Sequence, residues 1–295
     1  MNFIKNAKNI IELLGTPKII QREAVPHVIA FSEIGNREEN QDNYYYDVDK
    51  GIYVVADGMG GYEGGKFCSK FAVDMIVNEL NETYENIQNK ELSLENIPSI
   101  LEETISDTNY ALHAMMENKK VSFLEDKGGT TIDILFIPKK TGYIAHVGDG
   151  MVALFNLEGE RYVEKVTDEH HHYPEYAEKL SPTKKQVIGS ILGLTSYLGK
   201  GSGLKIDMHK IRPKQNQVIG LFTDGVTKTV TQREMLDIIS SNRLEDIEKT
   251  FIDRINNPVE IKKIVETMEK EDYDVSMNSM KGDNATGLLY GVIPK

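Results

Sequence analysis

The sequence predicts an α+β fold in which β-sheets pack face to face within one domain. Strand-like runs come first along the chain, long helical segments follow, and strands return after them. This order, without regular alternation of strand and helix, is typical of an α+β sandwich and not of a doubly wound fold. The 295 residues contain no internal repeat, low-complexity tract or linker that would divide them. A chain of this length can bury an ample core as a single unit.

The first half of the chain is expected to hold three strands and then two helices. The strand-like segments are 27–34, 44–48 and 52–56. Gly64-Gly65 opens the first helix, and its apolar residues recur at helical spacing. These residues are Phe67, Phe71, Ala72, Met75, Ile76 and Leu80. The second helix is expected from about Ser93, which can cap it, to about Glu117.

The second half returns to strands around an irregular insert. Strands are expected over 130–137, 143–147, 151–155, 204–211 and 218–222. Residues 167–203 lose all periodicity and gather His, Pro, Gly and Ser, which indicates a functional or mobile loop, here called the flap. A helical block is expected from Thr231 to about residue 273, and a last strand over 285–292.

Composition restricts the partners and the compartment. The net charge of -12 argues against binding of nucleic acid or of an anionic membrane surface. Cys68 is the single cysteine, so no intramolecular disulfide can form, which fits a reducing, cytoplasmic location. No apolar run approaches the roughly 20 residues that span a bilayer. Residues 1–25 are expected to form a helical extension outside a main domain of residues 26–295.

Three expected strands end in an Asp-Gly pair, which is the strongest functional signal in the sequence. Asp57, Asp149 and Asp224 each follow an apolar run, and Asp283 precedes the last one. A single Asp-Gly after a strand is more often a turn. As a set without a Cys or His pattern, however, strand-terminal carboxylates suit hard cations such as Mg²⁺ or Mn²⁺. With Arg37 to orient an oxyanion, they form the inventory of a two-metal hydrolytic site.

The sequence resembles the metal-dependent protein phosphatases (the PPM or type 2C family), particularly their bacterial branch, from about Val28 to Ile293. Six motifs carry the resemblance, in family order and at family-like intervals. They are Arg37-x-x-Asn40-Gln41-Asp42, Val55-Ala56-Asp57-Gly58-Met59-Gly60-Gly61, Gly128-Gly129-Thr130-Thr131, His146-Val147-Gly148-Asp149, Thr223-Asp224-Gly225 and Asp283-Asn284. The resemblance implies a four-layer α-β-β-α sandwich, with two mostly antiparallel sheets face to face, helices outside and the flap beside the active site.

The resemblance also implies a role for each acidic motif. Asp57 would bridge two Mn²⁺ or Mg²⁺ ions, and the carbonyl of Gly58 would bind one of them. Asp224 and Asp283 would complete the coordination of the second ion, and Asp42 would hold metal-bound water. Water shared between the metals would attack the phosphate of phosphoserine or phosphothreonine directly, without a phosphoenzyme. The metal cluster is therefore expected at one rim of the sandwich.

The remaining implied roles concern the substrate and a third metal. Arg37 would contact the substrate phosphate with its planar fork. Asp126 falls where the family places a ligand of a weaker third metal, although a solvated loop carboxylate is the competing interpretation. The roles of Asp149 and His170 stay open. Phosphorylated proteins are the expected partners, and a monomer is the expected oligomeric state.

Three departures from the family pattern bear on the chemistry. Met59 stands where animal relatives carry a His often proposed as general acid, although Met is usual in bacterial members. Gly150-Met151 replaces a common Ser-Arg after Asp149, which indicates a structural change at that turn. Thr167-Asp168-Glu169-His170-His171-His172 expands a Thr-x-Asp-His segment. Three adjacent His residues rarely face one ion together, so a solvated loop with His170 as a structural hydrogen-bonding residue is favoured over a transition-metal site.

Two other functions remain compatible with this pattern. A catalytically silent member could keep the fold as a binding or regulatory module, although such a protein has no need to retain every acidic ligand and Arg37. A phosphatase of small-molecule phosphate monoesters would use the same chemistry. The sequence does not separate that function from protein dephosphorylation, because specificity lies in the flap and outer surface.

Overall fold

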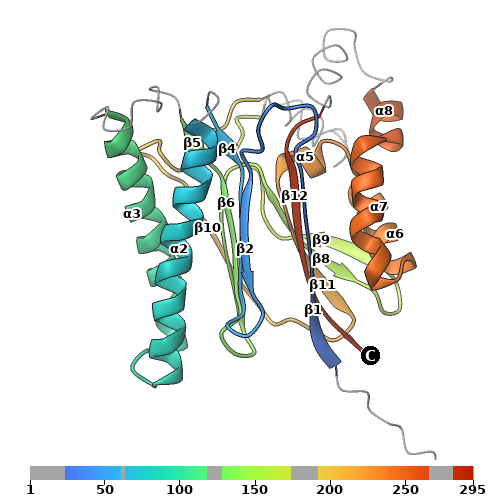
Figure 1. The fold of residues 1–295 in the computed structure, drawn as a ribbon. Helices are drawn as coiled ribbons and strands as arrows, with labels where there is room; N and C mark the ends of the chain where they lie inside the picture. Colours follow the sequence, from blue (N-terminus) through green and yellow to red (C-terminus); the bar gives the residue numbers. More distant parts are fainter. Residues whose placement is uncertain (1–23, 61–63, 118–127, 174–191, 266–281, 295) are drawn as a thin grey trace, which may run out of the picture.

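The computed structural model describes residues 24–60, 64–117, 128–173, 192–265 and 282–294 (Figure 1). The expected N-terminal helix, Asp126 and the middle of the flap lie outside the described residues. Two five-stranded sheets pack face to face, with helices on the outer face of each (Figure 1). The predicted four-layer α+β sandwich is confirmed.

The first sheet has the strand order β1-β12-β11-β8-β9, and every pairing in it is antiparallel. Its strands are β1 (Ala24–Glu33), β12 (Ala285–Pro294), β11 (Gln217–Phe222), β8 (Met151–Asn156) and β9 (Tyr162–Lys165). The pairing of β1 with β12 runs from Ala24 opposite Pro294 to Glu33 opposite Ala285. It therefore brings the loop after β1 beside the residues that precede β12. The edge strand β9 was not predicted, because its short, polar sequence buries no side chain fully.

The second sheet has the order β10-β7-β6-β3-β2 and is also antiparallel. Its strands are β10 (Asp207–Ile211), β7 (Gly142–Val147), β6 (Ile132–Phe136), β3 (Ile52–Ala56) and β2 (Asn43–Asp47). The three central strands are buried at every residue, since helices cover one face and the first sheet covers the other. The strand expected over 204–211 begins only at Asp207. Two short strands, β4 (Gly58–Met59) and β5 (Gly129–Thr130), pair beyond the end of β3.

Two long helices cover the second sheet, as the sequence predicts. They are α2 (Gly64–Gln88) and α3 (Ile97–Glu117), with the short helix η1 (Leu94–Asn96) capped by Ser93 between them. The buried stripe of α2 includes Cys68, Ala72, Ile76 and Leu80. The prediction that Met75 lies in this stripe is wrong, because its side chain is 37% exposed. Successive residues are about 100° apart around a helix, so Met75 lies to one side of Ile76.

The C-terminal helices cover the first sheet. They are α5 (Asp224–Thr227), α6 (Gln232–Ser241), α7 (Leu244–Asn256) and α8 (Val259–Val265). Thr231 begins α6, as predicted for the start of the helical segment, through a capping box with Glu234. Phe251 of α7 stacks on Phe31 of β1, with ring centroids 5.0 Å apart. The single turn α5 was not predicted, since four residues carry no periodic signal. No helix in the described ranges is both long and apolar enough to cross a bilayer.

Candidate active site

The carboxylates at three strand ends meet at one rim of the sandwich. Asp57 follows β3, Asp224 opens α5 directly after β11, and Asp283 precedes β12. β11 pairs with β12 so that Phe222 lies opposite Gly287, which brings the end of one strand to the start of the other. Asp57, Asp224 and Asp283 line one cavity of about 560 Å³ together with Arg37 and Asp149. The labels β4, β5 and α5 mark this end of the molecule (Figure 1).

The Gly-Thr-Thr motif holds the backbone of Asp57 in place. The Thr131 amide donates to the Asp57 carbonyl at 2.9 Å, and the Asp57 amide donates to Thr131 Oγ1 at 3.0 Å. Thr130 Oγ1 donates to the same carbonyl at 2.8 Å. A side chain at Gly58 would collide with the carbonyl oxygen of Gly65, so only glycine fits beside Asp57. These contacts fix the backbone of Asp57 at the rim.

Asp42 lies beneath this rim and does not belong to the cavity lining. Its carboxylate is buried, and Oδ2 accepts a hydrogen bond from Thr223 Oγ1 at 2.9 Å. The Thr223 hydroxyl in turn accepts from the Thr286 amide at 2.9 Å. Burial raises the pKa of Asp42 to about 7, although hydrogen bonds from Thr286 and Thr223 oppose the change. The other oxygen of Asp42 is buried without a hydrogen-bond partner.

Among the described residues, the carboxylates at this site outnumber the basic side chains beside them. Burial, followed by the charges of Asp42, Asp224 and Asp283, raises the pKa of Asp57 well above its usual range. Burial and the charge of Asp224 raise the pKa of Asp149 to about 8. Oδ1 of Asp224 is buried without a partner. Buried carboxylate oxygens that lack donors are the ligands that hard divalent cations use, so the residues present fit the expected metal ions.

Two basic side chains already contact the acidic pair at this rim. The Lys228 ammonium forms ion pairs with Asp224 Oδ2 and, at 3.0 Å, with Asp283 Oδ2. Arg37 contacts Asp283 Oδ1 at 2.9 Å. Within the described ranges, no three carboxylate, His or Cys side chains are already arranged around one point as metal ligands are. The carboxylates of Asp224 and Asp283 are thus turned toward Lys228, a residue that sequence reasoning missed. Its only sequence signal is the four-residue spacing from Asp224.

The loop that carries Arg37 is tied to the start of β12. Asn284 Oδ1 accepts from the Gln41 amide at 2.9 Å, and its Nδ2 donates to the carbonyls of Ile34 and Glu39 at 2.9 and 3.1 Å. The Arg37 side chain is 59% exposed, which leaves its guanidinium open to the cavity mouth. The Asp-Asn motif therefore both supplies a carboxylate and positions the arginine loop.

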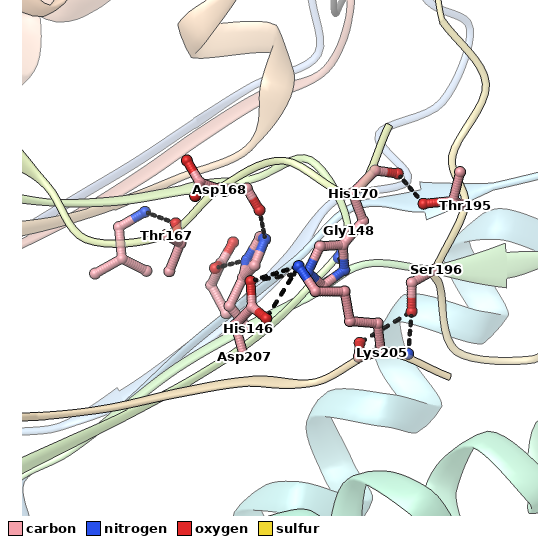
Figure 2. A network of polar contacts seen from close by, with 11 residues as sticks. His146, Gly148, Thr167, Asp168, His170, Thr195, Ser196, Lys205 and Asp207 are labelled. Carbon is pink, nitrogen blue, oxygen red and sulfur yellow. Dashed lines mark hydrogen bonds and ion pairs between the residues drawn. The ribbon is translucent and has the colours of Figure 1, made fainter. Parts of the chain in front are cut away.

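A buried polar network supports the turn that bears Asp149 (Figure 2). His146 Nδ1 contacts Asp133 Oδ1 at 2.7 Å, and its Nε2 contacts the Asp168 carbonyl at 3.1 Å. Both partners are acceptors, so both ring nitrogens donate. Burial lowers the pKa of His146, but the charge and hydrogen bond of Asp133 outweigh burial and raise that pKa above its ordinary value. The two acceptors around the ring and the charge of Asp133 thus favour the protonated form of His146 in the core.

His170 joins the beginning of the flap to the same turn (Figure 2). Its Nδ1 accepts from the Gly148 amide at 3.2 Å, and its Nε2 donates to Asp207 Oδ2 at 3.1 Å. Burial and the neighbouring charge of His146 lower the pKa of His170 to about 4, so the ring stays neutral. These contacts are those of a structural hydrogen-bonding residue. His171 points elsewhere, with Nε2 at 3.5 Å from Asp149 Oδ2, and the two rings therefore do not share one ion site.

Packing explains why the residue that follows Asp149 is a glycine. A side chain at Gly150 would collide with Asp133 Oδ2 and approach the Phe222 carbonyl. The buried pair of Asp133 with His146 needs this space. The departure from Ser-Arg at Gly150-Met151 is therefore coupled to a carboxylate in β6, which no local pattern reveals.

Fold and site together define a class of protein. An α-β-β-α sandwich with surplus carboxylates and one open arginine at its rim is suited to hold divalent cations beside a tetrahedral oxyanion. The protein phosphatase 2C family profile matches residues 31–267. The chain belongs to this family, a family of metal-dependent protein phosphatases.

Known proteins that resemble the chain carry consistent names. The protein phosphatase PhpP of Streptococcus pneumoniae is 26% identical over 232 residues, which cover 75% of this chain and 87% of PhpP. The serine/threonine phosphatase Stp1 of Staphylococcus aureus has the same fold, with a TM-score of 0.68 at 18% identity, covering 94% of this chain and 99% of Stp1. The catalytic domain of the phosphatase PstP, solved with 2 manganese ions, matches with a TM-score of 0.66 at 16% identity over 91% of this chain and 99% of that domain.

Proposed function

We propose that this protein hydrolyses phosphoserine and phosphothreonine in proteins, using two divalent cations held at the acidic rim. The observation that carries the proposal is the meeting of Asp57, Asp224 and Asp283 around one cavity with Arg37 at its mouth. Family membership supports the reaction class. PhpP and Stp1 are named as phosphatases, which supports a protein substrate.

The residues that would hold the cations are Asp57, the Gly58 carbonyl, Asp224 and Asp283. Two Mn²⁺ or Mg²⁺ ions bound there would supply charge neutralisation and an acidified water molecule as the nucleophile. Asp57 would be the ligand shared by both ions, and the hydrogen bonds of Thr130 and Thr131 to its backbone hold the residue at the cavity. No side chain forms a covalent bond to phosphate in this scheme.

Arg37 is proposed to bind and orient the phosphate. Its side chain lines the cavity, is 59% exposed and contacts Asp283 Oδ1 at 2.9 Å. A planar guanidinium can form two parallel hydrogen bonds to a phosphate and is then held more tightly than by one carboxylate contact. Arg37 would leave Asp283 for the substrate, which frees that carboxylate for a cation.

Asp42 is proposed to position the attacking water from below the rim. Its carboxylate lies next to the strand end that carries Asp224, because Thr223 donates to Asp42 Oδ2 and accepts from the Thr286 amide. The other oxygen, Oδ1, is buried without a hydrogen-bond partner. No histidine is among the described residues that line the cavity, and His171, the imidazole next to Asp149, lies behind that carboxylate with its side chain only 2% exposed. Solvent would supply the proton to the leaving alkoxide.

The proposal is tested by hydrolysis of a phosphothreonine peptide and of p-nitrophenyl phosphate at increasing Mn²⁺ concentration. Wild type is expected to turn over both substrates, whereas Asp57→Asn and Asp224→Asn are expected to lose at least a hundredfold in kcat/KM. Asp74→Asn is the matched control, because Asp74 lies on exposed α2 surface and pairs only with the i−4 residue Lys70 among the described contacts. No turnover by wild type with metal supplied would favour a silent binding module. Turnover of the small ester alone would favour a small-molecule substrate.

A further inference from the structure

Lys228 holds a position at the acidic rim that is unusual for a lysine. It is the C-cap residue of α5, and its backbone amide donates to the Asp224 carbonyl at 2.7 Å. From there the side chain turns back, so that its ammonium contacts Asp224 Oδ2 and lies 3.0 Å from Asp283 Oδ2. Only 11% of the side chain is exposed. One ammonium therefore bridges two carboxylates that come from different parts of the chain.

The ammonium stays charged in this setting. The ammonium is paired with a carboxylate oxygen of Asp224 and with one of Asp283, and two such anionic partners favour its protonated form. Arg37 contacts the other oxygen of Asp283, but its side chain is 59% exposed and lies at the cavity mouth. Lys228 is thus the buried positive charge that balances this pair of carboxylates in the part of the chain that the structure describes.

The contacts of Lys228 use the oxygen atoms that a divalent cation would need. Oδ2 of Asp224 and Oδ2 of Asp283 both face the ammonium, while Oδ1 of Asp224 remains buried without a partner. A lysine and a divalent cation cannot both approach the same two oxygens closely, since like charges repel strongly at a buried site. Cation binding therefore requires the Lys228 side chain to move away from at least one of the two carboxylates.

We propose that Lys228 is a built-in cation that holds Asp224 and Asp283 together in the metal-free protein and competes with one divalent ion for them. The inference rests on the proposed function, because it assumes that these carboxylates bind metal. Two consequences are expected: a gain in stability of the metal-free fold and a loss of metal affinity. Lys228 stabilises the metal-free fold by neutralising buried carboxylates, and it weakens the affinity of the site for one of its two cations.

The proposal is tested with Lys228→Met, which keeps most of the aliphatic stem and removes the charge. Isothermal titration with MnCl₂ is expected to give a Kd about tenfold lower than wild type for one of the two equivalents, a change of about 1.4 kcal/mol. The metal-free variant is expected to melt at a lower temperature than wild type, and saturating Mn²⁺ is expected to remove or reverse that difference. Lys50→Met is the matched control, because Lys50 is also partly buried and pairs with Asn81 and Glu85. Its Kd is expected to equal that of wild type.

A second variant keeps the proposal testable if Lys228→Met does not fold without metal. Lys228→Arg retains the charge and adds a planar guanidinium that can donate hydrogen bonds to both carboxylates. Its Mn²⁺ Kd is therefore expected to rise above that of wild type. An unchanged Kd in either variant, or weaker binding in a folded Lys228→Met, would overturn the proposal. Absence of any Mn²⁺ binding by wild type would instead contradict the proposed function.

Discussion

The Thr223 hydroxyl is predicted to be the link between the buried Asp42 and the strand ends that carry the other carboxylates. It donates to Asp42 at 2.9 Å and accepts from the Thr286 amide at 2.9 Å. Thr223→Val keeps the shape and removes both contacts. A hydrogen bond to an ionised carboxylate is worth about 1.5–3 kcal/mol, and an unsatisfied buried amide costs about 1–3 kcal/mol. We expect the free energy of unfolding to fall by about 2.5–6 kcal/mol, measured by urea denaturation at pH 8 in EDTA.

A control variant that also loses a buried hydroxyl separates the effect of Thr223→Val from a general loss of stability in the core. Thr108 is fully buried in α3 and donates to the Thr104 carbonyl at 2.7 Å, so Thr108→Val is expected to cost only about 1 kcal/mol. With Mn²⁺ present, Thr223→Val is also expected to lower kcat at least tenfold, because Asp42 loses the donor that orients it, whereas Thr108→Val leaves kcat unchanged. Equal stability losses in the two variants, or an unchanged kcat in Thr223→Val, would refute the reasoning.

Three further predictions follow from other contacts of the site. Arg37→Ala is expected to raise KM for a phosphothreonine peptide at least tenfold, while calorimetry shows an unchanged Mn²⁺ Kd. Loss of metal binding would contradict the proposed role of Arg37. The exposed ion pair of Arg37 with Asp283 should add under about 1 kcal/mol to stability. The pKa of His170 is lowered from 6.5 to about 4, so the unfolded chain takes up this proton first. Stability should therefore fall as pH drops from about 6.5 to 4, by about 1–2 kcal/mol more than in His170→Gln after a discount for solvent screening; parallel pH profiles would contradict this. Gly150→Ser is expected to collide with Asp133 Oδ2 and lower the melting temperature. Asp133→Thr removes that oxygen but also the buried partner of His146, so it should destabilise by itself; if the two positions are coupled, adding Gly150→Ser to it should cost less than in wild type, and additive losses would contradict the coupling.

The parts of the site that follow from strand ends could be predicted from the sequence. An apolar run that stops at Asp-Gly gives both the end of a buried strand and a carboxylate at its mouth, which is why Asp57 and Asp224 were identified and lie at one cavity. Thr231 was identified as a helix start because capping chemistry is local. The ordered series of motifs then predicted the four layers, because it linked these local signals to one known topology.

The contacts that the sequence did not reveal are non-local. Lys228 reaches Asp283, 55 residues away, and nothing in the local pattern around either residue indicates that contact. Gly150 depends on Asp133, which comes from a strand two positions earlier along the chain. Asp42 was expected near metal-bound water, and the structure places it under the rim beside Thr223, outside the cavity lining. Charge balance in a buried site is a property of the assembled fold, so it cannot be read from single motifs.

The central claim is that acidic residues from distant strand ends share a pair of cations. Anomalous diffraction from a crystal soaked in Mn²⁺ tests it most directly. We predict two manganese peaks in the cavity, both next to the Asp57 carboxylate and one of them also next to Asp224 and Asp283, with the Lys228 ammonium moved away from that pair. An empty rim with Lys228 still seated between Asp224 and Asp283 at saturating Mn²⁺ would contradict the claim.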